Sequence, residues 1–478
     1  MYIKIRNNIL FRKYDKYGYI TDNSEFGYRM LNDNSPIHGE KFVSQSGAIM
    51  LSILDKYPKH IDDIVNELSK IFIGVDNETL KADTIEFFQY FLDKEYLSIG
   101  KTPEECKDKI FLEKNESQDM NHSISIISNE NCTKKALEIN KFLKSIHIEV
   151  ANACNERCVH CYIPHEYKNS FIDSEFFYEI IEAGRKMNII HVTLSGGEPL
   201  LHQDIIGFLE KCRKMDLSVN VLSNLTVLNN EIITEMKKNP LLSVQTSIYS
   251  MNPEIHDSIT KLNGSLEKTI KGLKKLSIEG IPVQISCPIM KQNKESFVDV
   301  IEWGKKHNIA VAIEPVIFAS YDHTGKNLSN RLSLKEIERT IDLELKEGYA
   351  ESLREIAKEK ENFTENDPIC SICRYSLCVS VSGDVYSCVG WENNIVGSLK
   401  TQSLQDIWDN SERIKYLRQI KRKKFPKCVN CEDRGYCTTC MMRNSNESQN
   451  GNAFKIEDFY CSVAKIIHKK VKMYCGEN

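Results

Sequence analysis

The cysteines of this 478-residue chain are concentrated in a few short segments. Eleven of the seventeen fall within residues 154–161, 370–388 and 428–440, and Cys461 follows shortly after them. An exported chain would use so many thiols as disulfides, but the charged N-terminus MYIKIRNNILFRKYDK has no apolar signal core. In a reducing compartment, clustered thiols more often bind metal. The spacing therefore predicts a cytoplasmic protein organised around metal centres.

Charge and hydropathy exclude two classes of partner. The chain carries 63 basic and 67 acidic residues, and this near balance argues against a nucleic-acid partner, which usually selects a basic domain. No stretch reaches the roughly 18 consecutive apolar residues of a membrane span. We therefore expect neither a nucleic acid nor a membrane among the partners.

The first hundred residues predict a small module of strands and helices. The segments ILFRKYD, YGYITD and YRMLN are short, rich in aromatic and β-branched residues, and separated by turn residues. Apolar residues then recur at helical spacing over Ser46–Tyr57, Ile61–Phe72 and Thr84–Leu97. This order indicates a winged-helix-like domain over 1–100, and the acidic third helix disfavours DNA binding. A polar linker is expected over 101–143.

From residue 144 the pattern changes to alternating strands and helices, which implies a parallel sheet with right-handed crossovers. The strand candidates are Ile146–Ala151, Ile190–Leu194, Ser218–Leu222, Leu242–Ile248, Val283–Ser286 and Ala310–Glu314. They predict an α/β fold, a partial (β/α)6 barrel of the TIM type over 144–345, with functional residues just beyond the C-terminal ends of the strands. The cysteine-rich remainder, 346–478, is expected to form a separate domain.

The first of these strands runs into a loop that contains Cys154, Cys158 and Cys161. Three thiolates can hold three irons of a [4Fe–4S] cluster and leave the fourth iron open for a ligand, whereas electron-transfer clusters use four cysteines. A zinc site with His160 or His165 as the fourth ligand is the alternative that this loop alone leaves open.

The second strand ends in the segment Ser195–Leu200, which reads SGGEPL. Its two glycines permit a ligand to approach the backbone closely. Together with the C-x3-C-x2-C loop about 34 residues earlier, this segment resembles the radical S-adenosylmethionine (SAM) superfamily. The resemblance implies that SAM binds the open iron and that the backbone at Gly196, Gly197 and Glu198 binds its amino group. Reductive cleavage of SAM would then give a 5′-deoxyadenosyl radical that removes hydrogen from a substrate.

The resemblance also implies further SAM contacts. The third strand ends at Ser223-Asn224, where the family often has Thr-Asn-Gly, and Leu225 replaces that glycine. Ser247 matches a recurrent family serine near the ribose. Lys261 stands where the family often has an arginine that pairs with the methionine carboxylate, although a lysine lacks the bidentate fork. We therefore expect Ser223, Asn224, Ser247 and Lys261 to contact SAM.

The C-terminal cysteines carry a second pattern. A predicted hairpin with a Ser-Gly-Asp turn lies among them, and the final group has C-x2-C-x5-C-x2-C spacing. They are Cys370, Cys373, Cys378, Cys388, Cys428, Cys431, Cys437, Cys440 and Cys461. Read alone, the final group predicts a structural zinc knuckle. The whole arrangement resembles SPASM, the auxiliary-cluster domain of peptide-modifying radical enzymes, although its last spacing is two residues where the usual pattern has three.

The SPASM resemblance implies two auxiliary [4Fe–4S] clusters whose ligands interleave along the chain. The outer cluster would be held by Cys428, Cys431, Cys437 and Cys461. The inner cluster would be held by Cys370, Cys373, Cys388 and Cys440. Cys378 competes with Cys373 as an inner ligand, and an inner cluster with an open iron is a further alternative.

The N-terminal module resembles the leader-binding (RRE, PqqD-like) domains of ribosomal peptide maturases. Such domains take a leader peptide as an added β-strand, and the expected docking edge is Tyr19–Asp22 or Phe26–Leu31. The three parts together imply the maturation of a ribosomally made precursor peptide (RiPP maturation). The implied reaction is a crosslink, most commonly a cysteine thioether, and the implied electron donor is of the flavodoxin or ferredoxin type.

Other functions fit parts of this pattern. A carbon–carbon crosslinking enzyme or a peptide epimerase would show the same three parts. An epimerase needs a thiol that returns hydrogen, and Cys287, at the end of the fifth strand, is the candidate. An anaerobic sulfatase-maturating enzyme shares the barrel and the clusters but needs no leader-binding module. A non-enzymatic leader carrier or electron-transfer module is disfavoured by the intact cysteine loop and glycine pair.

Overall fold

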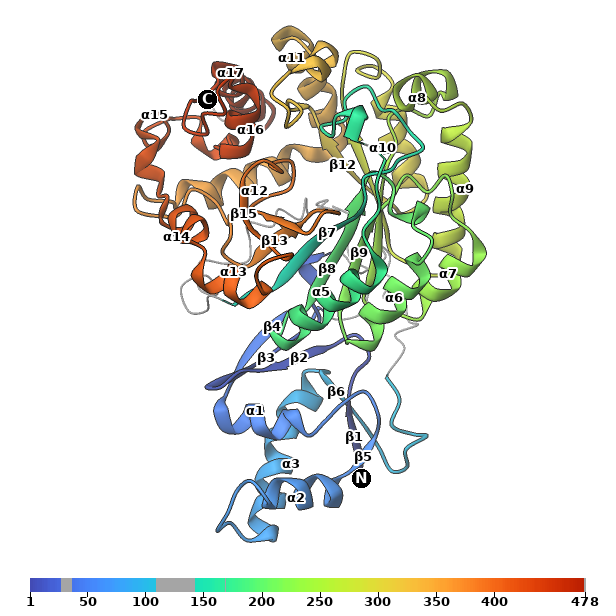
Figure 1. Cartoon of the computed structure of the whole chain (residues 1–478), viewed down its shortest axis with the longest axis vertical. Helices are drawn as coiled ribbons and strands as arrows, with labels where there is room; N and C mark the ends of the chain where they lie inside the picture. Colours follow the sequence, from blue (N-terminus) through green and yellow to red (C-terminus); the bar gives the residue numbers. More distant parts are fainter. Residues whose placement is uncertain (27–36, 109–141, 168, 477–478) are drawn as a thin grey trace.

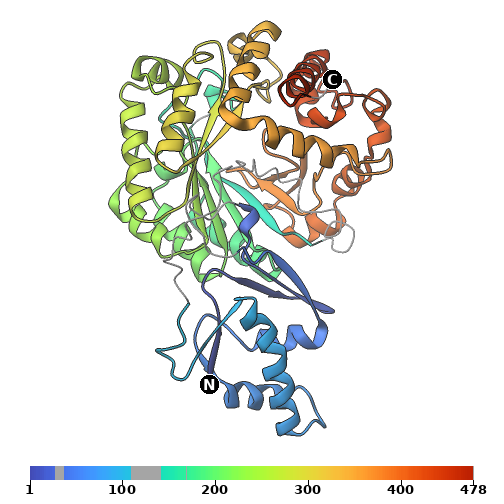
Figure 2. The same ribbon diagram turned by 180° about the vertical axis from the view of Figure 1, so that it is seen from behind.

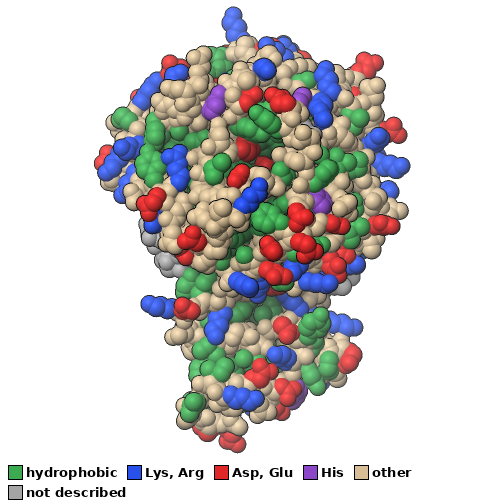
Figure 3. All heavy atoms as spheres, viewed as in Figure 1, with side chains coloured by type: hydrophobic (Ala, Val, Ile, Leu, Met, Phe, Trp, Pro, Cys, Tyr) green, Lys and Arg blue, Asp and Glu red, His purple; other side chains and the backbone are tan. Residues whose placement is uncertain are grey.

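The computed structural model describes residues 1–26, 37–108, 142–167 and 169–476. An N-terminal module lies at one end of the molecule, below a large sheet with its helices, and the cysteine-rich C-terminal part lies beside that sheet (Figures 1 and 2). Acidic and basic side chains are interspersed over the face shown in Figure 3. None of the helices in the described ranges is both long and apolar enough for a bilayer span.

The N-terminal module has its own hydrophobic core and two small antiparallel sheets. One sheet contains, in spatial order, β5 (Lys59–His60), β1 (Tyr2–Ile5) and β6 (Leu97–Gly100). The other contains β2 (Leu10–Lys13), β3 (Tyr17–Thr21) and β4 (Glu40–Ser44). The helices are α1 (Gln45–Ser52), α2 (Ile61–Ser69) and α3 (Asn77–Asp93).

The structure corrects several expectations for this module. β3 pairs with β2 on one side and with β4 on the other, so Tyr19–Asp22 is not a free edge. The expected strand YRMLN, and all of Phe26–Leu31 after Phe26, lie outside the described residues. The third strand of the sheet is β4, and no described strand pairs with its outer edge. α3 begins well before the predicted stretch because the Asp76 carboxylate caps its first N–H groups.

The central sheet confirms the predicted α/β fold. Its six parallel strands are β7 (Ser145–Ala151), β8 (His191–Gly196), β9 (Ser218–Leu222), β10 (Leu242–Ser247), β11 (Val283–Pro288) and β12 (Ala310–Glu314), each within two residues of its predicted bounds. The crossover helices are α5 (Ser174–Lys186), α6 (Ile205–Lys214), α7 (Asn230–Lys237), α9 (Ser265–Ile278) and α10 (Phe297–Lys306). An additional helix, α8 (Pro253–Thr260), was not predicted; it is capped by Asn252 and begins with a proline.

Side chains alternate across the two faces of this sheet. One face is apolar and packs into the main hydrophobic core, as Ile148, Val221 and Ile285 illustrate. The opposite face carries polar side chains, including Gln245 and Gln284, which stand side by side in register on β10 and β11. The barrel therefore has a polar interior side and an apolar, helix-covered side.

The C-terminal part continues the barrel sheet. Its strand β13 (Ser376–Val379) pairs in parallel with β7 and forms the predicted hairpin with β14 (Asp384–Tyr386), which β15 (Ile395–Ser398) extends. The result is one continuous sheet of nine strands. The helices of this part are α11 (Leu334–Glu344), α12 (Ala350–Glu361), α13 (Leu404–Asn410), α14 (Glu412–Gln419), α15 (Pro426–Val429), α16 (Met441–Glu447) and α17 (Asp458–Tyr474).

The N-terminal module packs against the N-terminal ends of the barrel strands. Leu10 and Tyr19 form an apolar cluster with Ile190 and Leu241, which immediately precede β8 and β10. The buried guanidinium of Arg12 donates a hydrogen bond to Ile189 C=O at 3.0 Å. It also donates hydrogen bonds to the side-chain carboxylate and the backbone carbonyl of Asp216. The module therefore lies at the end of the barrel opposite the C-terminal strand ends.

Arg12→Ala is expected to loosen this contact and to destabilise the folded chain by about 3 kcal/mol, because it leaves buried acceptors without their charged donor. Limited proteolysis and urea unfolding should show earlier release of the module. Arg339→Ala is the matched control, since Arg339 is 70% exposed in its ion pair with Glu295 and should cost at most about 0.5 kcal/mol. Equal effects for the two variants would contradict a structural role for Arg12.

Candidate functional site

The cysteine loop and the glycine pair lie at the C-terminal ends of adjacent strands, where the sequence predicted them. β7 ends at Ala151 and β8 ends at Gly196, and these two residues face each other in the sheet. Gly197 N–H donates to Ala151 C=O at 2.5 Å, and Glu198 N–H donates to Ala153 C=O at 2.9 Å. The glycine segment therefore supports the backbone that leads into the cysteine loop.

The two glycines are required by this close approach. Gly196 has a φ of +125°, and a Cβ atom on it would lie 1.8 Å from the Ala151 carbonyl oxygen. A Cβ atom on Gly197 would lie 2.4 Å from the carbonyl oxygens of Asn152 and Ala153. The backbone of the cysteine loop therefore occupies the space that side chains would need, and the predicted contact of the glycine segment with SAM stays a prediction.

Hydrogen bonds from other segments hold the cysteine loop in place. Arg157 N–H donates to Thr260 C=O at 2.9 Å, and Val159 N–H donates to Ile259 C=O at 3.0 Å, which ties the loop to the end of α8. The Asn330 side chain donates to Val159 C=O at 2.9 Å. The loop presents three partly exposed thiols, those of Cys154, Cys158 and Cys161.

Glu198 is fully buried and joins the ends of two strands. Its carboxylate accepts hydrogen bonds from Leu200 N–H at 3.0 Å, from the Ser223 hydroxyl at 2.7 Å and from Asn224 N–H at 2.7 Å. Burial raises the pKa of Glu198 to about 7 despite these donors. The Asn224 side chain in turn donates to Asn155 of the cysteine loop at 2.9 Å. These side chains position the loop, and their contact with SAM stays a prediction.

The other predicted residues lie on different faces. Ser247 ends β10 on the polar face of the sheet, beside Ser286 of β11. Lys261 ends α8 in a left-handed conformation, with φ of 59°, and its side chain is exposed. Cys287 is fully buried in the apolar core with Ile285, and burial raises the pKa of its thiol to about 12. The structure therefore separates Cys287 from the polar face and gives no support to a hydrogen-donor role.

The cysteines predicted for the inner cluster lie together around Cys388. Burial raises the pKa of the Cys388 thiol well above its usual value, and the neighbouring thiols of Cys440, Cys370 and Cys373 raise it further. Cys378, on β13, is also a neighbour of Cys388. The competition between Cys373 and Cys378 as an inner ligand therefore stays open.

A buried pair of carboxylic acids adjoins the inner cysteines. Glu149, on β7, is 3% exposed, and its carboxylate accepts a hydrogen bond from the Tyr386 hydroxyl at 2.7 Å. Both carboxyl oxygens of Glu392 are buried beside the Glu149 carboxyl. Burial raises the pKa of Glu149 to about 7, and burial together with the nearby Glu149 charge raises the pKa of Glu392. The pair can therefore hold a proton near neutral pH.

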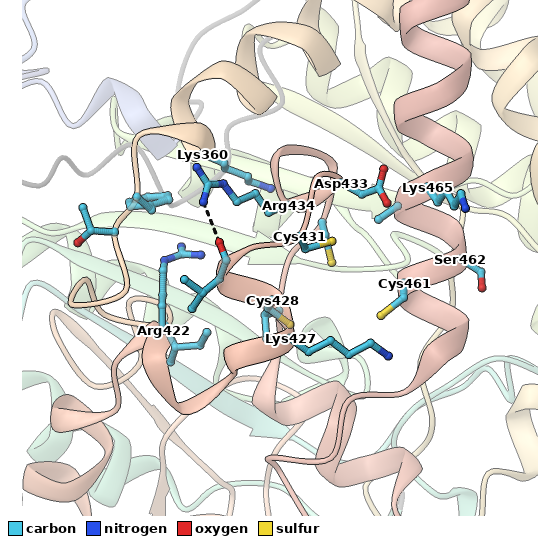
Figure 4. Close-up of a pocket in the computed structure, with 17 residues that line it drawn as sticks. Lys360, Arg422, Lys427, Cys428, Cys431, Asp433, Arg434, Cys461, Ser462 and Lys465 are labelled. Atoms are coloured by element: carbon cyan, nitrogen blue, oxygen red, sulfur yellow. Dashed lines mark hydrogen bonds between the residues drawn. The ribbon is translucent and has the colours of Figure 1, made fainter.

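The four cysteines predicted for the outer cluster line one cavity. Cys428 lies on α15 and Cys461 on α17, while Cys431 and Cys437 lie on either side of a short 3-10 turn at 434–436. Together they line a cavity of about 300 Å³ (Figure 4). Burial, and then the three neighbouring thiols, raise the pKa of the Cys437 thiol to about 11. Segments that are distant in sequence thus converge on one thiol-lined space.

The spacing of the thiols bears on which metal they hold. Zn²⁺ binds thiolates at about 2.3 Å in a tetrahedron, which requires the sulfur atoms to lie within about 4 Å of one another. Within the described ranges, no three His, Cys, Asp or Glu side chains converge in this way on a single ion. A [4Fe–4S] cluster is a larger body held by thiolates at its corners. The choice between zinc and iron–sulfur clusters therefore rests on the families that match these two segments.

Two groups of residues were not predicted. Glu149 and Glu392 belong to no recognisable motif, because they are distant in sequence and only the fold brings them together. The run of cations in KRKKFPK, residues 421–427, directly precedes Cys428 and was visible in the sequence. A run of like charges directly beside a cysteine motif is the sequence feature that could have identified this group as functional.

Known families match the two parts of the chain that carry the cysteines. The model of the radical SAM superfamily matches residues 148–304, and the model of SPASM, an iron–sulfur cluster-binding domain, matches residues 370–432. The AdoMet-dependent heme synthase of Methanosarcina barkeri is 27% identical over 323 residues, which is 62% of this chain and 90% of that protein. The Bacillus subtilis antilisterial bacteriocin subtilosin biosynthesis protein AlbA is 22% identical over 318 residues, which is 65% of this chain and 70% of that protein.

The fold also resembles a solved structure over nearly its whole length. The crystal structure of Streptococcus suis SuiB bound to precursor peptide SuiA has a TM-score of 0.59 to this chain at 16% sequence identity. The match covers 97% of this chain and 100% of that chain. The chain therefore contains a radical SAM domain within residues 148–304 and a SPASM domain within residues 370–432, with SAM and [4Fe–4S] clusters as cofactors.

Proposed function

We propose that this chain is a radical SAM maturase that installs a crosslink, specifically a cysteine thioether, in a ribosomally made precursor peptide. The observation that carries the proposal is the union of three parts in one chain. These are the cysteine loop at the strand ends, the two auxiliary cysteine sets, and an N-terminal module with a strand edge that no described strand pairs with. When bound, SAM and its cluster supply the radical that removes a hydrogen atom from the peptide.

The residues of the chain supply orientation and a place for a proton. Formation of a thioether removes two hydrogens from the peptide: one leaves as an atom to the adenosyl radical, and the other leaves as a proton and an electron. That electron would pass to the cluster held by the inner cysteines. The Glu149 carboxyl lies beside the inner cysteines, where that proton would be released. It accepts a hydrogen bond from the Tyr386 hydroxyl and adjoins Glu392. Closely placed carboxyls share a proton readily, because two like charges in a buried site are unfavourable.

The relatives support a peptide substrate without specifying the bond. The name of AlbA refers to bacteriocin biosynthesis, and the SuiB structure contains a precursor peptide, whereas the heme synthase does not act on a peptide by name. The barrel and SPASM domain thus leave the substrate open, and the N-terminal module is what favours a leader-bearing peptide. The same module counts against a sulfatase-maturating function. Epimerisation and carbon–carbon crosslinking are the alternatives that the experiment below distinguishes.

Anaerobic reconstitution tests the proposal directly. The holoprotein is incubated with SAM, dithionite and the short cysteine-containing peptide encoded beside its gene, and the product is analysed by mass spectrometry. Loss of two hydrogens per event, together with loss of one alkylatable thiol, is expected for a thioether. Loss of two hydrogens with all thiols retained would indicate a carbon–carbon crosslink. Deuterium uptake without net hydrogen loss would indicate epimerisation, and either outcome would overturn the thioether assignment.

The strand edge that the leader would join is the outer edge of β4. Asp22 N–H donates to Gly39 C=O, just beyond the ends of β3 and β4. Hydrogen bonding alternates along an antiparallel pair, so this bond turns the N–H and C=O groups of Glu40, Phe42 and Ser44 away from β3. Phe42 is 41% exposed and packs against Tyr19. The edge therefore offers backbone groups and an aromatic side chain to an added strand.

Phe42→Pro is expected to weaken binding of the leader peptide by roughly tenfold or more, because proline removes an outward-facing N–H while leaving the bonds to β3 in place. Phe42→Ala is the matched control, since it removes the ring but keeps the N–H. Fluorescence anisotropy with a labelled leader peptide measures both affinities. Equal affinity for the proline and alanine variants would show that the leader does not pair with β4.

A further inference from the structure

The outer cysteine cavity is surrounded by positive charge. Besides the four thiols, the side chains that line it include those of Lys360, Arg422, Lys427, Arg434 and Lys465, with Asp433 as the acid among them (Figure 4). Asp433 is already engaged, because its carboxylate pairs with His468 at 2.8 Å. The cavity thus combines partly exposed thiols with a cationic border.

The positive charge extends from the cavity along the segment that precedes Cys428. Residues 421–427 read KRKKFPK, which places five cations and no acid in seven positions. The side chains of Lys421, Lys423 and Lys424 are exposed and make no ion pair with any described residue. Lys427 pairs with Asp458 at 2.7 Å, but both side chains are largely exposed. We name the group Lys421, Arg422, Lys423, Lys424, Lys427 and Lys465 the basic rim.

The basic rim is a local feature of an acidic chain. The whole chain has a formal net charge of −4, so a run of cations that includes three exposed lysines without an ion pair to any described residue is not a consequence of composition. Clustered like charges repel one another and contribute nothing to folding, but they accelerate the association of a partner with the opposite charge. The feature is therefore best explained by a partner that binds from solution.

The chemistry inside the rim selects the class of that partner. Arg422, Lys427 and Lys465 of the rim line the cavity together with the thiols assigned to the outer cluster, so a molecule docked on the rim lies beside those thiols. We propose that the basic rim docks a small acidic electron-transfer protein of the flavodoxin type, which donates electrons through the outer cysteine set. One electron leaves the reduced flavin of the carrier and one enters the iron held by these cysteines. The inference rests on the proposed function, since the reductive cleavage of SAM that starts the reaction needs an electron from a carrier.

Binding of a bacterial flavodoxin to the reconstituted holoprotein tests the inference. The double variant Lys423→Glu/Lys424→Glu is expected to weaken the affinity at least roughly tenfold and to flatten its dependence on salt, because charges at the rim of an interface act mainly through electrostatic steering. Lys271→Glu/Lys274→Glu on α9 is the matched control, since it changes the charge equally at two exposed lysines outside the rim. Calorimetric titration at two ionic strengths measures the affinity.

Two reductants separate failure of this inference from failure of the proposed function. If the wild-type holoprotein does not modify the precursor peptide with dithionite, the proposed function is wrong. If dithionite supports turnover but the rim variant binds flavodoxin as tightly as the α9 variant does, the docking surface is wrong. Tighter binding of transfer RNA than of flavodoxin, lost in the rim variant, would also overturn the inference and identify a nucleic-acid surface. Selective loss of flavodoxin binding and of flavodoxin-driven turnover supports it.

Discussion

Replacing Cys158 by alanine is expected to abolish SAM cleavage, with a fall of at least about 1,000-fold in 5′-deoxyadenosine formation. Two thiolates cannot retain a cluster that three normally hold, and without it no iron is available to bind and reduce SAM. The variant should still fold, because Cys158 is partly exposed on a loop that backbone hydrogen bonds hold in place. Chromatography of the products and iron analysis of the purified protein measure the two effects.

The iron analysis should show the loss of one cluster and the retention of two. Cys475→Ala is the matched control, because this partly exposed cysteine lies at the end of α17 and belongs to none of the three predicted sets. It should keep both its iron content and its SAM cleavage. SAM cleavage at the wild-type rate by the Cys158 variant would show that the thiolates of this loop do not hold the reactive cluster.

Gly196→Ala is expected to destabilise the barrel by about 4 kcal/mol or more. Two penalties add. The φ of +125° is a positive value that residues with a side chain rarely adopt, and the Cβ atom would lie 1.8 Å from the Ala151 carbonyl oxygen. Neither can be relieved without separating the ends of β7 and β8. Urea unfolding of the metal-free protein measures the change without a contribution from cluster binding.

Gly280→Ala isolates the first of these penalties. Gly280 also has a positive φ, +72°, but a Cβ atom there would meet nothing within 4 Å. The control should therefore cost only about 1–2 kcal/mol. Equal costs at the two positions would mean that the backbone of the cysteine loop does not lie against the glycine segment in solution.

Local patterns predicted the barrel well and located the cysteine motifs. The six strands were readable because each is a short segment of alternating apolar residues followed by a segment with helical spacing, and the cysteine motifs were readable because metal binding dictates the spacing of the ligands. Non-local pairing was not readable. β13 joins the barrel sheet beside β7, although more than two hundred residues separate them, and nothing in either segment specifies that partner. The steric constraint on the glycine pair was not readable for the same reason, since the atoms that crowd it belong to the end of another strand and the loop that follows it.

Four strands of the N-terminal module, β1, β4, β5 and β6, were not predicted, and the miss at β4 has a physical cause. Three strands were expected before the first helix, and the aromatic segment YGYITD was taken as an edge. In the structure that segment is central, and the edge is EKFVS, a segment whose charged and partly exposed residues gave a weak strand signal. Edge strands commonly carry such charged residues, which protect them from unwanted pairing.

The position of the module beneath the barrel sets a minimum length for any substrate held by both ends. The module meets the start of β7, and the cysteine loop follows its end, so the two are separated by at least the seven residues of that strand, about 23 Å. An extended peptide covers about 3.4 Å per residue. Under the proposed function, roughly seven or more residues must therefore separate the recognised part of the precursor from the side chain that is modified. Precursors with a shorter spacing could not reach both sites at once.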